Sequence, residues 1–178
     1  QQGQDIDGEA AYDKSGRSIS MNAAGDRVAI GASENDGIGR TNSGHVRIYE
    51  WDGTSWIQKG QDIDGLFQYD EFGGSVSMNA TGDRLVIGAI EANHAMIYAW
   101  DGTSWTNTSN TTWVISGESN NDGFGSSVSM NAAGDRVAIG AADNDGNGNK
   151  SSTIKIGVYI NPNLYVLTVY LCALINHT

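Results

Sequence analysis

One motif occurs three times in this chain, and it constrains the fold more than any other feature. The run at residues 20–32, SMNAAGDRVAIGA, returns with few changes at residues 77–89 and again at residues 129–141. A long period built from short apolar runs and Gly/Asp turns is typical of arrays of supersecondary units. Residues that appear in every unit are expected to hold the unit together, so the repeat predicts architecture rather than chemistry.

Each unit divides into short strands that follow one another in antiparallel order. In the first unit, residues 18–21 alternate polar and apolar side chains, and residues 27–32 form a more apolar second strand. Residues 46–51 alternate again, and a fourth strand is predicted to run from residue 56 towards residue 61. Four antiparallel strands connected in sequence order form the blade of a β-propeller.

The fold class predicted is all-β, with antiparallel four-stranded blades of a β-propeller and about three blades. Propellers close with about four to eight blades, so we expect an incomplete or open propeller. We assign residues 1–178 to a single repeat domain, with units at residues 1–56, 57–105 and 106–178.

The two ends of the chain depart from the repeat. Residues 1–8 parallel residues 58–65, so they are predicted to belong to a fourth strand that precedes the first unit. The tail diverges from about residue 150, where residues 154–156 could stand for a third strand and residues 164–175 for a last one. That last apolar run is too short for the ~20 residues of a membrane-spanning helix, so a membrane span is not expected. An out-of-frame end of the coding sequence is the other interpretation of this tail.

Charge and cysteine content exclude some functions. The formal net charge is −11, so nucleic acid would be repelled and is not an expected partner. Cys172 is the single cysteine, and it cannot form an intrachain disulfide.

Two segments carry a family resemblance. Phe72-Gly73 leads into the Gly-Asp-Arg run that ends at Ala89, and Phe124-Gly125 leads into the run that ends at Ala141. These segments resemble FG-GAP repeats, the blade units of integrin-α-type β-propellers, in the divergent form of large microbial and marine surface proteins. The first unit departs from the pattern with Ser15-Gly16, and no unit has the final Pro of Gly-Ala-Pro. The resemblance implies an extracellular binding or adhesion platform, often with calcium in the blade loops, and it implies no enzyme.

The loop after the third repeat is the best candidate site. Oxygen-bearing side chains at alternate positions with glycines between them can wrap a calcium ion. The predicted metal ligands are Asp143, Asp145, Asn147 and Asn149. The equivalent loop at residues 34–39 keeps fewer ligands, and the second unit has lost it. The alternative is an Asn/Asp/Gly-rich turn without an ion.

Other polar and aromatic residues recur in step with the repeat. His45 and His94 precede the third strands and are expected to be structural rather than metal ligands. Asp-Ile-Asp-Gly occurs at residues 5–8 and 62–65, where turn chemistry is favoured over metal binding. Tryptophans flank Asp-Gly hairpin turns, which predicts cross-strand pairs, with a ligand-stacking surface as the alternative. They are Trp51, Trp56, Trp100 and Trp105.

These observations favour a non-catalytic binding or adhesion module, stabilised by calcium, in an extracellular or cell-surface location. Its partner is expected to be a protein or glycan at a cell surface, and open sheet edges could support self-association. One alternative is a structural spacer within a large surface protein. Another is the accessory domain of a secreted hydrolase.

Overall fold

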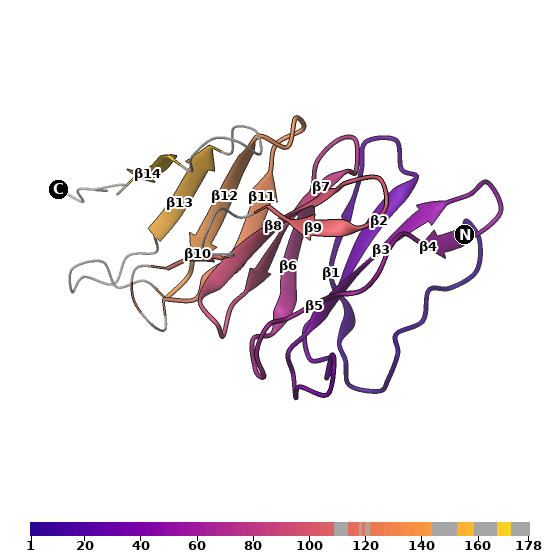
Figure 1. The fold of residues 1–178 in the computed structure, drawn as a ribbon, viewed down its shortest axis with the longest axis horizontal. Coiled ribbons are helices and arrows are strands. Elements are labelled where there is room, and N and C mark those ends of the chain that lie inside the picture. Colours follow the sequence, from indigo (N-terminus) through magenta and orange to yellow (C-terminus); the bar gives the residue numbers. More distant parts are fainter. Residues whose placement is uncertain (109–113, 118, 120–121, 144–152, 159–166, 172–178) are drawn as a thin grey trace.

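The computed structural model describes residues 1–108, 114–117, 119, 122–143, 153–158 and 167–171, and the last two segments are described as backbone. The described regular elements are all strands, arranged in three antiparallel sheets that stand side by side (Figure 1). The first sheet contains β1 (Ser15–Met21), β2 (Arg27–Ala32), β3 (His45–Trp51), β4 (Trp56–Gln58) and β5 (Ile63–Asp64). The second contains β6 (Phe72–Met78), β7 (Arg84–Ala89), β8 (His94–Trp100), β9 (Trp105–Asn107) and β10 (Ile115–Ser116). The third contains β11 (Phe124–Met130), β12 (Arg136–Ala141), β13 (Thr153–Val158) and β14 (Leu167–Leu171).

This arrangement confirms the predicted fold class. The first four strands of each sheet pair antiparallel and in sequence order, as in a propeller blade, and the three sheets do not close into a ring. We refer to the sheets as blades 1, 2 and 3.

The repeat fixes the strand register. Ile19 pairs with Ile30 in blade 1, and the equivalent residues pair in the same way in blades 2 and 3. Each first strand also contains an irregularity at a glycine with positive φ, which only glycine adopts without strain. These glycines are Gly16, Gly73 and Gly125.

The divergent tail continues the third sheet. In β13, Lys155 pairs with Ile139, the register that Arg47 has with Ile30 in blade 1. β14 pairs with β13 within the range predicted for the last strand. Both strand predictions are therefore confirmed, while the predicted turn at residues 161–163 lies outside the described residues.

The fourth strand differs from the prediction of one run from residue 56 to residue 61. β4 ends at Gln58, and β4 and β5 pair with opposite ends of β3. The break contains Gly60, whose φ of 82° leaves the strand conformation. Residues 1–8, likewise predicted to belong to a fourth strand, contain no strand.

The connecting segments pack on tryptophan pairs of the following blade. Trp51 and Trp56 pair across a hairpin with their ring centroids 5.4 Å apart, and Trp100 and Trp105 pair in the same way at the same distance. The predicted cross-strand packing is therefore confirmed. The indole Nε1 of Trp56 donates to the Gln2 carbonyl at 3.2 Å. Trp105 donates in the same way to Lys59 at 2.9 Å. Residues 1–14 and the segment after Gln58 therefore occupy equivalent places.

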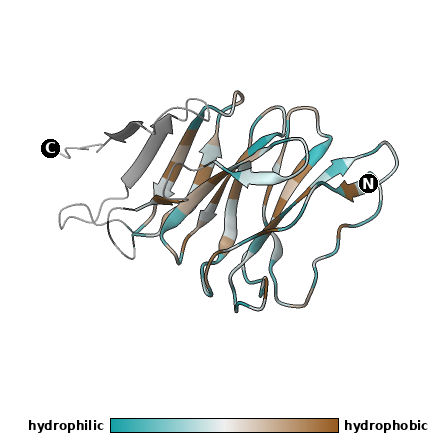
Figure 2. Ribbon diagram, viewed as in Figure 1, coloured by the Kyte–Doolittle hydropathy of each residue, from teal (hydrophilic) through white to brown (hydrophobic). Residues whose placement is uncertain are grey.

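The core lies between the blades and is formed mainly by their middle strands, which are the most apolar (Figure 2). Between blades 1 and 2, Ile48, Phe72 and Leu85 are buried. Between blades 2 and 3, Ile97 and Phe124 are buried. Burying this surface is the main stabilising contribution to the stack of blades. Within the described part of the chain, no helix is long and apolar enough to cross a membrane.

Candidate functional site

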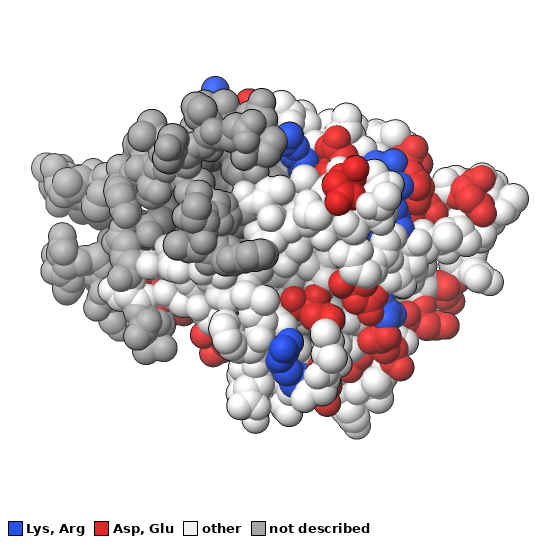
Figure 3. All heavy atoms as spheres, viewed as in Figure 1, with Lys and Arg blue, Asp and Glu red and all other residues white. Residues whose placement is uncertain are grey.

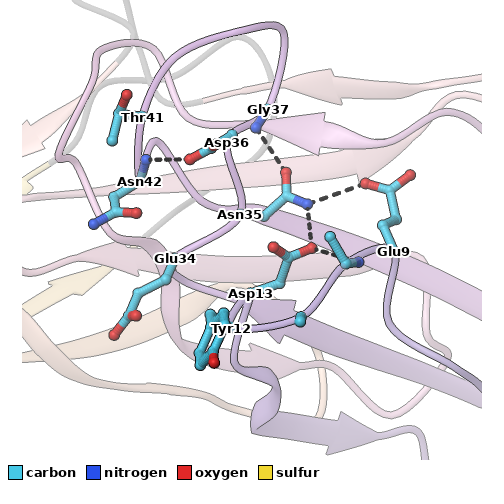
Figure 4. A pocket seen from close by; sticks show the side chains of 11 residues that line it. Glu9, Tyr12, Asp13, Glu34, Asn35, Asp36, Gly37, Thr41 and Asn42 are labelled. Carbon is cyan, nitrogen blue, oxygen red and sulfur yellow. Dashed lines mark hydrogen bonds between the residues drawn. The ribbon is translucent and has the colours of Figure 1, made fainter.

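A cleft opens at one end of blade 1, between the segment before β1 and the loop that joins β2 to β3 (Figure 4). Its volume is about 480 Å³, within the usual range for ligand pockets. Four carboxylate residues line it, and neither lysine nor arginine does so among the described residues. The four are Glu9, Asp13, Glu34 and Asp36.

Asp13 shapes the turn that forms one wall of this cleft. Its buried carboxylate accepts a hydrogen bond from the backbone N–H of Ala10 at 3.1 Å. Asp70 and Asp122 hold the corresponding turns of the other two blades, each accepting from a backbone N–H three residues earlier at 2.8 Å. Because this aspartate recurs in all three blades, its first role is to shape the turn.

Asn35 ties the two walls of the cleft together. Its amide Nδ2 donates to Asp13 Oδ2 at 2.8 Å and to Glu9 Oε2 at 3.1 Å, as Figure 4 shows. Its Oδ1 accepts from the backbone N–H of Gly37 at 2.7 Å, which fixes the start of the loop. Asp36 closes the loop by accepting from the backbone N–H of Asn42 at 3.1 Å. This network preorganises the acidic wall.

Glu9 also belongs to an ion cluster beside the cleft. The Arg47 guanidinium donates to both oxygens of Asp62, at 3.0 and 2.8 Å, and to Glu9. These bonds hold the pKa of Asp62 below its ordinary value and raise that of Arg47. The imidazole of His45 lies against this pair, with Nδ1 3.6 Å from Glu9 Oε2.

His45 has an uncommon environment. Its side chain is buried, and among the described residues its Nδ1 has no hydrogen-bond partner. Burial lowers its pKa, the nearby Arg47 lowers it further, and the surrounding carboxylates oppose the shift. The imidazole is therefore held mainly neutral at pH 7.

Ligand atoms of Glu9, His45 and Asp62 lie within 4.8 Å of one another, a grouping compatible with a metal ion. However, the Arg47 guanidinium already donates to Glu9 and forms a two-pronged hydrogen bond with the Asp62 carboxylate, so it occupies the space between these side chains. The arrangement observed is an ion-pair network, and a metal would have to displace the guanidinium.

Blade 2 shows that this cluster is not part of the repeated framework. By strand register, His94 occupies the place of His45 and Met96 the place of Arg47. The register of β5 and β10 likewise places Val114 where blade 1 has Asp62. The loop between β7 and β8 is also shorter, and it keeps only Glu91, at the place of Glu34, as an acidic residue. Blade 2 therefore lacks the Arg47–Asp62 pair of blade 1.

The predicted calcium loop is only partly described. Asp143 is exposed, and its backbone N–H donates to the Asp122 carbonyl at 2.9 Å. Asp145, Asn147 and Asn149 lie outside the described residues, so that site stays a prediction. In the equivalent loop of blade 1, Asn35 and Asp36 are engaged in hydrogen bonds within the cleft wall.

Sequence reasoning missed Glu9 and Asp13 as site residues. Glu9 stands where the second unit has Leu66, so a comparison of aligned repeats would have marked it as a departure. Acidic side chains also gather over this half of the molecule in the view of Figure 3.

Comparisons with known proteins support the fold. No family model matches the chain, and no curated protein matches it. Among solved structures, a candidate 6-phosphogluconolactonase from Bacteroides uniformis is similar at a TM-score of 0.57 and 9% identity, over 85% of this chain and 39% of that one. Hydrazine synthase from Kuenenia stuttgartiensis matches at a TM-score of 0.53 and 9% identity, over 86% of this chain and 37% of that one. Saccharomyces cerevisiae Sqt1 matches at a TM-score of 0.52 and 14% identity, over 90% of this chain and 37% of that one.

These similarities show a propeller-like fold and carry no information on function, because the identities are so low. This chain spans about two fifths of the length of each of these structures, with covered shares of 39%, 37% and 37%.

Proposed function

We propose that these blades form a non-catalytic extracellular binding module, and that the acidic cleft of blade 1 receives a cationic group of its ligand. A lysine or arginine side chain of a cell-surface protein fits this chemistry. The resemblance of the repeats to FG-GAP blades supports the extracellular and adhesive parts of the proposal.

The observation that carries the proposal is the concentration of carboxylates in one preformed cleft. Glu9, Asp13, Glu34 and Asp36 line a space of about 480 Å³, and the loop that supplies two of them is shortened in blade 2. A feature that the repeat does not require for folding is the best candidate for binding. Carboxylates around one cleft also attract a basic partner over some distance.

The proposed test is fluorescence anisotropy with two labelled hexapeptides, one alternating Lys and Ala and the other alternating Glu and Ala. We expect saturable binding of the lysine peptide, weakened as salt screens the carboxylates. Replacing Glu34→Gln together with Asp36→Asn should weaken it by about tenfold, or about 1.4 kcal/mol.

A matched control removes the same charge elsewhere. Glu91, the blade 2 counterpart of Glu34, and Asp7 are both exposed, so Glu91→Gln with Asp7→Asn should leave binding within about twofold of the parent chain. An equal loss of peptide affinity in the two double variants would indicate general attraction by the net charge and would contradict binding in the cleft. Failure to bind either peptide would favour the structural spacer.

A further inference from the structure

The contact between neighbouring blades is the same at both interfaces. Ser18 Oγ donates to the Gly73 carbonyl at 2.6 Å, and Ser75 Oγ donates to Gly125 at 2.7 Å. The backbone N–H of Met78 donates to Ser20 Oγ at 2.9 Å, and that of Met130 donates to Ser77 Oγ at 2.9 Å. Each blade therefore has a serine face, which presents two hydroxyls to the next blade, and a methionine face, which receives them.

Two further bonds repeat between the turns that follow the first strands. Arg27 Nη1 donates to the Gly82 carbonyl at 3.3 Å, and Arg84 Nη1 donates to Gly134 at 3.3 Å. A backbone bond from Ala23 to Ala80 at 3.1 Å recurs as one from Ala80 to Ala132 at 3.0 Å. Four hydrogen bonds thus define one interface, used twice.

A glycine in each second strand allows this close approach. A Cβ built on Gly31 would overlap the carbonyl oxygen of Gly73, and one on Gly88 would overlap that of Gly125. At Gly140, the equivalent position of blade 3, the only atom that a Cβ would overlap is the hydroxyl oxygen of Ser127. The serine face of blade 3 consequently has the same shape but no described neighbour against Gly140.

Exposure shows that both ends of the stack are open. On blade 3, Ser127, Ser129 and Arg136 are exposed, whereas their counterparts in blades 1 and 2 are half-buried. On blade 1, Ile19 is 67% exposed, whereas its counterpart Val76 is 9% exposed. Met21 is 54% exposed in the same way, against 6% for Met78.

The two open faces are complementary halves of the same interface. We propose that two copies of this chain associate head to tail, with the serine face of blade 3 in one copy docked on the methionine face of blade 1 in the other. Ser127 Oγ then donates to the Gly16 carbonyl of the second copy, and the Met21 N–H of that copy donates to Ser129 Oγ. Arg136 reaches the Gly25 carbonyl of the second copy.

Two such contacts can form at once. If each copy uses both faces, the pair is related by a twofold axis and closes a ring of six blades, within the range of known propellers. Closure covers Ile19 and Met21 in both copies, which removes apolar surface from water.

Light scattering after size exclusion tests this proposal. The expected mass is twice the 18.9 kDa of one chain, and it should fall to that of one chain on dilution. A monomer at every concentration would overturn the proposal and leave the two faces to further blades of a longer protein. A ladder of higher masses would overturn ring closure, because an open head-to-tail contact forms filaments.

Gly140→Ala is the sharpest variant. The added methyl group meets only a movable hydroxyl within its own blade, but it would strike the incoming Gly16 carbonyl as a Cβ at Gly88 would strike Gly125. This variant should stay folded by circular dichroism and become monomeric. Ile19→Arg should do the same, whereas Ile57→Arg, at an exposed residue of β4, should still form the dimer.

Mixing identifies the head-to-tail arrangement. Gly140→Ala blocks the serine face and Ile19→Arg blocks the methionine face, so an equimolar mixture retains one intact interface per pair. We expect the mixture to contain dimers that neither variant forms alone. A mixture that stays monomeric, or a dimer that survives Gly140→Ala, would overturn the proposed interface.

Discussion

At the scale of single residues, several glycines in this chain are required by close approach. Gly88 lies in β7 and has no positive φ, so its importance comes from the neighbouring blade rather than from its own backbone conformation. Its counterpart Gly140 has the same local sequence and no such neighbour among the described residues. The two positions form a natural comparison.

Gly88→Ala should lower the free energy of unfolding by about 1–3 kcal/mol, because the new methyl group overlaps a backbone carbonyl that cannot rotate away. The measurement is urea denaturation at a concentration where the chain is monomeric. Gly140→Ala is the matched control and should change the unfolding free energy by less than about 1 kcal/mol. Equal costs at both positions would contradict the proposed cause.

The two buried histidines predict a pH dependence of stability. Burial is the largest cause that lowers the pKa of both His45 and His94 from the ordinary 6.5. The unfolded chain therefore takes up protons on these histidines at a higher pH than the folded chain does. Their contribution to stability is complete above pH 6.5 and is lost as the pH falls towards the folded values.

The melting temperature should accordingly fall between about pH 7 and pH 5.5. Asp64 and Asp70, whose pKa values are raised by burial from the ordinary 3.8, act in the opposite direction. Replacing both histidines with Asn should flatten the curve in this window. An equally steep curve in the double variant would assign the effect to other groups.

At the scale of elements, β3 and β8 are equivalent third strands that carry different side-chain pairs, an ion pair in blade 1 and an apolar pair in blade 2. In blade 1, Arg47 on β3 pairs with Asp62 and Glu9. In blade 2, Met96 takes the place of Arg47 and Val114 takes the place of Asp62. The side chains of Arg47 and Asp62 are 17% and 28% exposed, so the pair is shielded but not fully desolvated. Both solutions satisfy the same strand pairing.

Arg47→Met should cost about 1–3 kcal/mol of unfolding free energy, because it leaves two carboxylates without their cation. Adding Asp62→Val, which copies blade 2, should recover most of this loss. Arg17→Met removes an exposed arginine of β1 and should change stability by less than about 0.5 kcal/mol. A double variant as unstable as the sum of its single changes would show that the two residues are not coupled.

At the scale of the whole molecule, the stack of blades is held by contacts between sheets. The loops at the blade ends carry the variable residues, as expected for a scaffold that presents binding loops. Calcium in the loop after β12 remains a prediction, and it is best tested on the stability of the entire chain.

Calcium binding to the folded state alone would raise stability by about 2.7 kcal/mol at a hundredfold excess over the dissociation constant. Thermal melts in excess calcium and in chelator should then differ, and Asp143→Ala with Asp145→Ala should abolish the difference. Glu34→Ala with Asp36→Ala serves as the control in the equivalent loop of blade 1. Superimposable melts for the parent chain would identify the loop as an ordinary turn.

Much of the fold could be predicted because its signals are local. Alternation in residues 18–21 and the Asp-Gly turns specified strands and hairpins, and the repeat let Lys155 be matched to Arg47 despite the divergent tail. The break at Gly60 was missed, because an apolar pattern does not show where a strand leaves its partner. The candidate site was missed for a related reason, since Glu9 and Asp13 come from the segment before β1, whereas Glu34 and Asp36 come from the loop between β2 and β3.

The sequence by itself determined the three repeats and the first three strands of each blade, because side-chain alternation and turn signals depend on neighbours along the chain. Only the tertiary structure decided which faces meet and which charges converge. Ser18 reaches Gly73, and Glu9 reaches Arg47, through the packing of segments far apart in sequence. Such contacts depend on how closely two backbones approach, and no local pattern encodes that distance.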